Sequence, residues 1–113
     1  MDTTRQQKIN RLLQKELSEI FLLEARDVIR GTILTVTQVR ITPDLSIARI
    51  YLSIFPSNQT EMVLNHIKEN TKSIRFQLGE RVRHQLRIIP ELTFYVDDSL
   101  DYIENIDTLL TKD

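Results

Sequence analysis

The sequence predicts a two-layer α+β domain in which helices cover one face of a three-stranded sheet. Apolar side chains recur at helical spacing over residues 4–24, whereas residues 33–41 and 46–55 have strand patterns and flank a proline-containing turn. Helical spacing returns over residues 60–89, and apolar residues alternate again after Pro90. The predicted order is α-β-β-α-α-β with a further helical piece at the C-terminus. A sheet of this size must bury one face, and the helices supply the cover.

The first predicted helix, residues 4–24, combines an apolar face with a basic stripe. Its apolar residues at helical spacing are Ile9, Leu12, Leu13, Leu17, Ile20 and Phe21. Lys8, Arg11 and Lys15 follow one another at i, i+3 and i+7 on a neighbouring face. Residues 25–31 are the expected connection to the first strand.

The two strands that follow are predicted to form an antiparallel hairpin. Residues 33–41 are rich in β-branched side chains, and residues 46–55 alternate between apolar and other positions. The tetrapeptide at 42–45 has turn chemistry, because Pro43 presets φ for the first turn position and Asp44 suits the second.

A helix pair is predicted after the hairpin. Pro56 interrupts the second strand, and Asn58 or Thr60 can cap a helix that begins near residue 60. The polar residues 68–72 interrupt the apolar pattern. We therefore predict two helices with a kink or short joint near residues 70–72.

The second helix of the pair is defined by four apolar residues spaced four apart, Ile74, Leu78, Val82 and Leu86. Pro90 forbids its continuation, and Leu92, Phe94 and Val96 alternate as a third strand. Asp98 or Ser99 is expected to cap a short terminal helix that holds Leu100, Ile103, Ile106, Leu109 and Leu110.

Length and composition are typical of one compact domain spanning residues 1–113. Apolar residues make up 41% of the chain and charged residues 27%, and there is no cysteine. The absence of cysteine excludes disulfides, thiolate catalysis and cysteine-based zinc sites. Neither a signal peptide nor an apolar run long enough to span a bilayer is visible. We expect a cytoplasmic monomer without cofactors.

The charges are distributed unevenly, although 15 basic and 16 acidic residues almost cancel. Residues 61–90 hold six basic residues and three acids, whereas residues 91–113 hold seven acids and one lysine. This asymmetry, more than the net charge, indicates a partner with phosphates. We expect the acidic end to lie on the surface turned away from such a partner, or to face basic proteins.

A helical wheel with Ile74 at zero gathers most of the cations on one side of the second helix of the pair. Arg75, Lys72, Arg83 and Arg87 fall at roughly 100°, 160°, 180° and 220°, and Arg81 lies on the other flank. Such spacing suits a phosphate backbone, where contacts release counterions and arginine binds bidentately. The predicted RNA-binding residues are Lys72, Arg75, Arg81, Arg83, Arg87, Lys8, Arg11 and Lys15, with Arg40 and Arg49 as further candidates. The alternative is a solvated basic face.

Two residues of this helix have open interpretations. Phe76 falls at roughly 200° among the cations, where it either stacks on a base or packs under another element. Gly79 costs about 1 kcal/mol relative to alanine within a helix. It therefore indicates a close approach, by another element or by RNA.

An enzymatic function is not expected. His66 and His84 lie on predicted helices without a serine, cysteine or acid at a revealing spacing. Asp97, Asp98 and Asp101 either hold a cation such as Mg²⁺ or end a strand and begin a helix, and the second interpretation is favoured. No phosphate-cradling motif is present, which argues against nucleotide hydrolysis.

The chain resembles a known family over nearly its whole length. The order α-β-β-α-α-β is that of a type II KH domain, and the sequence within it resembles ribosome-binding factor A. The resemblance rests on residues 9–21, 36–55 and 74–102, above all on TPDLSIARIYLS and RIIPELTFYVDDS.

The resemblance implies an RNA-binding factor of ribosome biogenesis that binds free small subunits during late maturation and acts near the ends of their rRNA. Members lack the Gly-x-x-Gly loop of ordinary KH domains, and this chain has only Gly31 and Gly79. The family joins the helix pair at an Ala-x-Gly kink, where this sequence reads Asn70-Thr71-Lys72. Asparagine still tolerates a kink there, and Lys72 is expected to contact phosphate.

Two classes of function remain open. In the first, the domain docks its basic face on rRNA of the immature small subunit, and its binding energy favours one rRNA conformation. In the second, it is a protein-interaction module whose basic helix meets an acidic partner.

Overall fold

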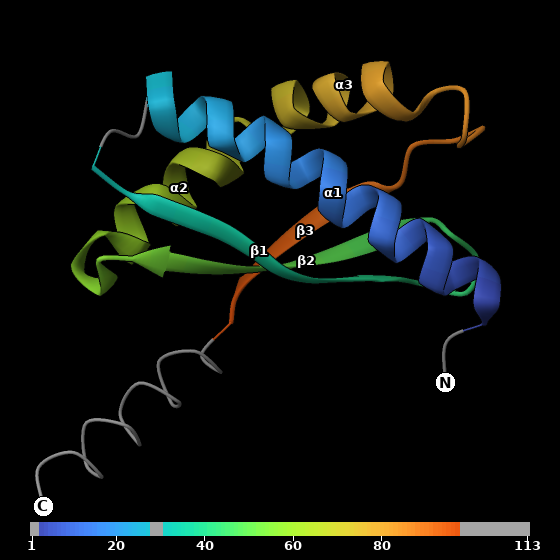
Figure 1. Cartoon of the computed structure of the whole chain (residues 1–113), viewed down its shortest axis with the longest axis horizontal. Helices are drawn as coiled ribbons and strands as arrows, with labels where there is room; N and C mark the ends of the chain where they lie inside the picture. Colours follow the sequence, from blue (N-terminus) through green and yellow to red (C-terminus); the bar gives the residue numbers. More distant parts are fainter. Residues whose placement is uncertain (1–2, 28–30, 98–113) are drawn as a thin grey trace, which may run out of the picture.

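A computed structural model of the chain describes residues 3–27 and 31–97. Helices lie on one face of a three-stranded sheet, which confirms the predicted α+β fold and its order (Figure 1). The elements are α1 (Thr4–Asp27), β1 (Ile33–Ile41), β2 (Ile47–Phe55), η1 (Ser57–Gln59), α2 (Thr60–Glu69), α3 (Thr71–Val82) and β3 (Glu91–Val96). The predicted terminal helix lies outside the described residues.

Helix α1 begins with a capping box and ends three residues later than predicted. The hydroxyl of Thr3 accepts a hydrogen bond from the Gln6 amide (3.1 Å), and the Gln6 side-chain oxygen accepts one from the Thr3 amide (3.0 Å). Its predicted apolar face is buried except for Leu12, which is half-buried, and Leu13, Leu17, Ile20 and Phe21 are fully enclosed. Phe21 meets Phe94 of β3 edge-to-face at 6.0 Å between ring centroids.

Amide side chains of α1 also cover the edge strand β1. Gln6 donates to the Ile41 carbonyl (3.1 Å), Gln14 donates to the Val36 carbonyl (3.1 Å), and Asn10 accepts from the Ile41 amide (2.8 Å). An uncovered edge strand exposes backbone groups that can pair with another chain. These three side chains, each four residues from the next, therefore satisfy part of that edge.

The sheet has the order β1-β2-β3, with β2 antiparallel to β1 and parallel to β3. A bulge between Val36 and Gln38 leaves Thr37 without a partner in the strand register. The Thr37 hydroxyl instead donates to the Asp97 carboxylate at 2.5 Å. Asp97 thus ends β3 with a structural contact, as the favoured interpretation of the sequence expects.

The turn between β1 and β2 forms as predicted, although Ser46 belongs to it and β2 begins at Ile47. The Leu45 amide donates to the Thr42 carbonyl (2.8 Å), and Leu45 has a φ of 64°. The Asp44 carboxylate accepts from the Thr42 and Ser46 hydroxyls (2.7 and 2.8 Å). These hydrogen bonds, Thr42 first, lower the pKa of Asp44 below its usual 3.8.

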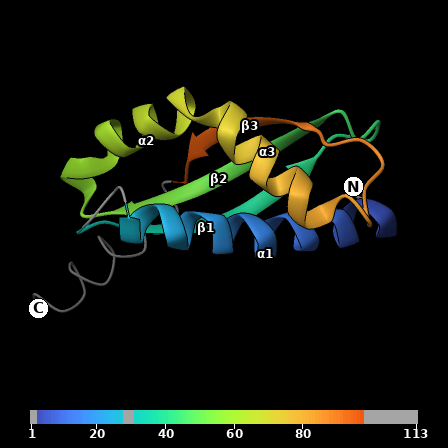
Figure 2. The same cartoon turned by 90° about the horizontal axis from the view of Figure 1, so that it is seen from above.

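The helix pair has the predicted joint but not the predicted caps. Gln59 is the N-cap residue of α2 and makes no side-chain cap hydrogen bond, whereas Asn58 lies in η1 and Thr60 is already helical. Asn70 separates α2 from α3 with φ −106° and ψ 18°, and its side-chain amide donates to the His66 carbonyl (2.8 Å). Figure 2 shows the resulting bend between the helices.

Helix α3 ends at Val82, so the prediction that it extends to Leu86 is wrong. The amides of Gln85 and Leu86 both donate to the Val82 carbonyl (2.8 and 2.9 Å), which closes a final turn. The chain then has to reverse so that β3 can run parallel to β2. Leu86 remains buried beyond the helix and keeps its place in the core.

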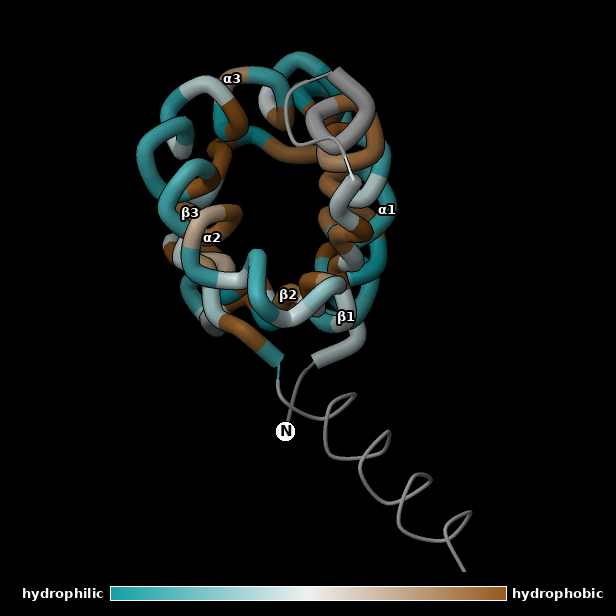
Figure 3. Tube along the Cα trace, turned by 90° about the vertical axis from the view of Figure 1, so that its left-hand side faces the viewer, coloured by the Kyte–Doolittle hydropathy of each residue, from teal (hydrophilic) through white to brown (hydrophobic). Residues whose placement is uncertain are grey.

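The core lies between the helices and the covered face of the sheet. Figure 3 shows apolar and hydrophilic positions interleaved along α1 and the strands, as expected of elements with one buried face. The helix-facing residues of β2 are Ala48, Ile50, Leu52 and Ile54, all of them buried. None of the helices in residues 3–27 and 31–97 has the length and apolar character needed to cross a membrane.

Candidate nucleic-acid interface

The cations predicted to share one helix are divided between α3 and the loop that follows it. Lys72 and Arg75 lie on α3 and are exposed. Arg83 is the C-cap residue of α3, with helical φ and ψ of −58° and −23°, and Arg87 lies further along the loop. Arg83 and Arg87 are exposed, and no ion pair within the described residues joins them to a carboxylate.

Arg81 is engaged by two carboxylates of α1. Its Nη1 lies 3.2 Å from Glu16 Oε2 and 2.5 Å from Glu19 Oε2, and its side chain is half-buried. Its charge is therefore balanced within the protein, and the guanidinium joins α3 to α1. This position removes Arg81 from the candidate surface, because a phosphate would compete with two carboxylates already in contact.

Arg75 is oriented by the backbone instead of being neutralised. Its Nε donates to the Pro90 carbonyl (3.0 Å) and its Nη2 donates to the Ile89 carbonyl (2.6 Å). Both acceptors are uncharged, so the guanidinium keeps its full positive charge. Gly79 lies against the same segment, and a Cβ there would meet Ile89 Cγ1 at 3.4 Å, an ordinary contact distance that alanine could also adopt. Another segment therefore packs beside Gly79, as one of its two interpretations expects, but this contact does not require glycine.

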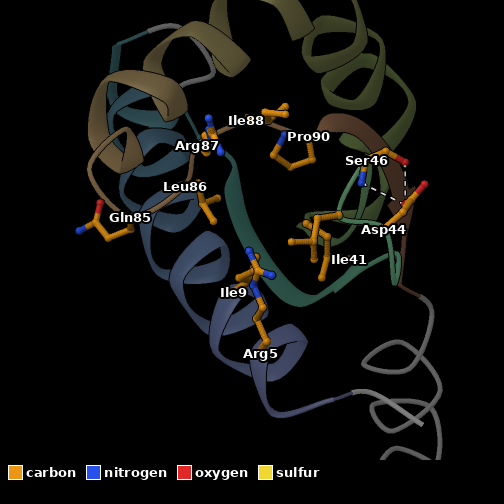
Figure 4. A pocket seen from close by; sticks show the side chains of 11 residues that line it. Arg5, Ile9, Ile41, Asp44, Ser46, Gln85, Leu86, Arg87, Ile88 and Pro90 are labelled. Atoms are coloured by element: carbon orange, nitrogen blue, oxygen red, sulfur yellow. Dashed lines mark hydrogen bonds between the residues drawn. The ribbon is translucent and has the colours of Figure 1, made fainter.

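The loop after α3 brings Arg87 beside the start of α1. Arg87 and Arg5 line one pocket of about 280 Å³, whose apolar lining includes Ile9, Ile41 and Leu86 (Figure 4). Sequence reasoning missed Arg5, although it precedes Lys8 by three residues and extends the same stripe. Asp44 of the hairpin turn also lines this pocket.

The stripe of α1 is exposed along its length. Lys8, Arg11 and Lys15 are all exposed. They lie roughly opposite the buried face on a wheel of about 100° per residue, and not on a neighbouring face as predicted. Because Ile9 and Leu86 line one pocket, this end of α1 and the loop with Arg87 lie side by side. We use the name basic surface for the exposed cations of α1, α3 and the loop after α3, namely Arg5, Lys8, Arg11, Lys15, Lys72, Arg75, Arg83 and Arg87. Within this set, Arg5 and Arg87 line one pocket, and Lys72 and Arg75 line another.

Arg40 and Arg49 do not belong to this surface. They are cross-strand partners in the β1–β2 register, and both are exposed on the face of the sheet opposite the helices. With the Gln38 amide oxygen turned toward it, Arg40 donates to that oxygen from Nε at 2.7 Å. The sheet therefore separates this pair from the cations of α1 and the loop.

The two histidines considered as catalytic candidates lie on different elements. His84 lies exposed in the turn after α3, and His66 is half-buried on α2 beside Asn70. Within residues 3–27 and 31–97, no three histidine or acidic side chains gather in a group that could hold a metal ion. Asp98 and Asp101 lie outside the described residues.

Comparison with known proteins gives one consistent family. The model of the family described as "Ribosome-binding factor A" matches residues 5–110. A ribosome-binding factor A of Cytophaga hutchinsonii is 46% identical over 112 residues, which covers 99% of this chain and 84% of that protein. The ribosome-binding factor A of Christiangramia forsetii is 50% identical over 107 residues, covering 94% of this chain and 82% of that protein.

Solved structures share the fold. The crystal structure of ribosome-binding factor A from Thermus thermophilus has a TM-score of 0.65 and 26% identity, covering 80% of this chain and 94% of that one. A homology model of the Thermus thermophilus factor, fitted into a cryo-EM map of its complex with 30S, has a TM-score of 0.60. It is 23% identical and covers 87% of this chain and 97% of that one.

Proposed function

Because this chain belongs to the ribosome-binding factor A family, we propose that it is a ribosome assembly factor that binds the immature small ribosomal subunit. In this proposal, residues 1–113 act as one RNA-binding domain of the cytoplasm and assist late rRNA maturation. The domain catalyses no bond chemistry; its binding energy stabilises one rRNA conformation over another. The Thermus factor described in a complex with 30S supports this choice of partner.

The observation that carries the proposal is the exposure of cations that have no carboxylate partner among residues 3–27 and 31–97. Arg83 and Arg87 follow α3, and Lys8 and Arg11 lie on the adjoining part of α1. Phosphates that contact such side chains release counterions, and this release supplies much of the affinity for nucleic acid. Arginine adds directional contacts through its planar fork.

Co-sedimentation with free small subunits and with intact ribosomes tests the proposal. We expect the protein to sediment with free small subunits, and Arg83→Glu combined with Arg87→Glu to abolish that association without unfolding the domain. Arg40→Glu combined with Arg49→Glu is the matched control, because it changes the net charge equally on the opposite face of the sheet. Retained association of the first double variant would refute the assignment.

A basic helix that meets an acidic protein partner is the alternative function. The dependence of rRNA binding on salt separates the two proposals. If roughly four phosphates are contacted, log K should fall with log salt at a slope of about −3 to −4. Saturable binding to a ribosomal protein alone, with no such slope for naked rRNA, would favour the alternative.

A further inference from the structure

A recess beside the first half of α3 combines cations with apolar side chains. It is a shallow recess of about 490 Å³, largely open to solvent, and is lined by Lys72, Arg75, Phe76 and Ile89. Among the described residues, its lining thus consists of two cations, one aromatic ring and one aliphatic side chain, and includes no acid.

Phe76 is the unusual member of this lining. Its side chain is 69% exposed, so no other described element covers the ring. The interpretation that Phe76 packs under another element therefore does not apply within the described residues. An isolated exposed apolar residue needs no explanation. This ring, however, shares a recess with two cations and a second apolar side chain.

The other walls of the recess are held in place by the fold. Ile89 packs beside Gly79, where a Cβ would lie 3.4 Å from Ile89 Cγ1. The guanidinium of Arg75 is fixed by the carbonyls of Ile89 and Pro90. The apolar wall and one cation are therefore oriented before any ligand arrives, which reduces the entropy cost of binding.

We propose that this recess holds one unpaired nucleotide of RNA. The base lies against the ring of Phe76 and the side chain of Ile89, and its phosphate contacts Lys72 and Arg75. Every base has a π-face that an aromatic side chain can stack on, so the site tolerates different sequences. A base within a duplex already stacks on its neighbours, so the site discriminates against paired RNA.

An acidic protein segment fits the recess less well than a nucleotide does. A carboxylate would satisfy Lys72 and Arg75 but would leave the exposed ring of Phe76 without a partner. A nucleotide supplies an anion and a planar apolar surface together. The inference rests on the proposed function, because it names the RNA element that one part of the basic surface binds.

Fluorescence anisotropy with two labelled RNAs tests the site in the full chain. One probe is an unstructured oligo(U) of about 12 nucleotides, and the other is a duplex of the same length. Phe76→Leu keeps an apolar side chain but removes the aromatic face. We expect it to weaken oligo(U) binding by about 5- to 100-fold and to leave duplex binding unchanged.

Two variants serve as controls for Phe76→Leu. Phe76→Tyr retains the ring and should bind oligo(U) like the original protein. Phe55→Leu alters a ring that is similarly exposed, at 58%, but lies at the far end of β2 outside the recess. It should leave both affinities unchanged. Thermal unfolding of each variant checks that the fold is intact.

The outcomes separate the nucleotide site from the proposed function. Unchanged oligo(U) affinity in Phe76→Leu, or an equal loss for oligo(U) and duplex, would overturn the nucleotide site. If Arg83→Glu with Arg87→Glu still abolished subunit association, the proposed function would stand. Failure of the original protein to bind either RNA would overturn the site and the rRNA docking together. A selective loss for oligo(U), restored by Phe76→Tyr, supports the site.

Discussion

Replacing Arg81 by glutamine should destabilise the domain without weakening its binding to RNA. The guanidinium contacts Glu16 and Glu19, and the side chains of Arg81, Glu16 and Glu19 are 31%, 16% and 50% exposed, respectively. Glutamine keeps much of the length of arginine but removes its charge. The variant therefore leaves two carboxylates close together without the cation between them.

The size of this effect follows from the exposure of the partners. An exposed ion pair contributes about 0.2–1 kcal/mol, and a hydrogen bond to a charged group that is less exposed, such as Glu16, contributes about 1.5–3 kcal/mol. The two contacts share one nitrogen of Arg81, so their contributions do not simply add. We expect a loss of about 1–2 kcal/mol in the free energy of unfolding. For a domain of this size, that corresponds to a fall in Tm of about 3–12 °C.

Arg83→Gln is the matched control, two residues further along the chain. Arg83 is exposed and has no carboxylate partner among the described residues. We expect the free energy of unfolding of the Arg83→Gln variant to differ from that of the original protein by less than about 0.5 kcal/mol. The slope of log K against log salt should become shallower by about 0.7–0.9, because one phosphate contact is lost.

Thermal unfolding by circular dichroism and rRNA binding at several salt concentrations measure the two effects. A double-mutant cycle of Arg81→Gln with Glu19→Gln isolates the coupling between those side chains. If Arg81→Gln left Tm unchanged and reduced the salt slope, the structural role of Arg81 would be refuted. Arg81 would then contact phosphate instead of α1.

Two further predictions concern stability. Gly79→Ala should raise the free energy of unfolding by about 0.5–1 kcal/mol, because alanine favours the helix and the new Cβ meets Ile89 at an ordinary contact distance of 3.4 Å; a lower midpoint in urea would show that Ile89 cannot adjust. Hydrogen bonds from Thr42, and then from Ser46, lower the pKa of Asp44 in the folded state below 3.8. Its contribution to stability is therefore present above the unfolded pKa, near pH 4, and lost as the pH falls through the folded pKa. Asp44→Asn should lower stability at pH 7 and reduce the difference in stability between pH 7 and pH 2, and an unaltered pH profile of unfolding would contradict this role.

The sequence by itself determined the elements whose signals are local. The apolar spacing that includes Leu13 and Leu17 identified α1, and the Pro43-Asp44 turn set the hairpin. The polar interruption at residues 68–72 located the joint at Asn70. Side-chain periodicity and turn preferences act over a few residues, so they can be read without knowing the partners in space. Residues 72–87 were likewise identified as basic, although they were predicted to form a single helix.

Tertiary structure alone decided where α3 ends and which of its cations remain available. The ion pairs of Arg81 join residues 65 and 62 positions apart, and no periodicity in either helix specifies them. Arg75 is held by carbonyls 14 and 15 residues away, in a segment that reverses so that β3 can pair with β2. Arg5 and Arg87 line the same pocket because of this reversal of the chain. A charged side chain finds its partner through the packing of distant segments, and that packing is set by burial of the whole core and not by the residues beside it.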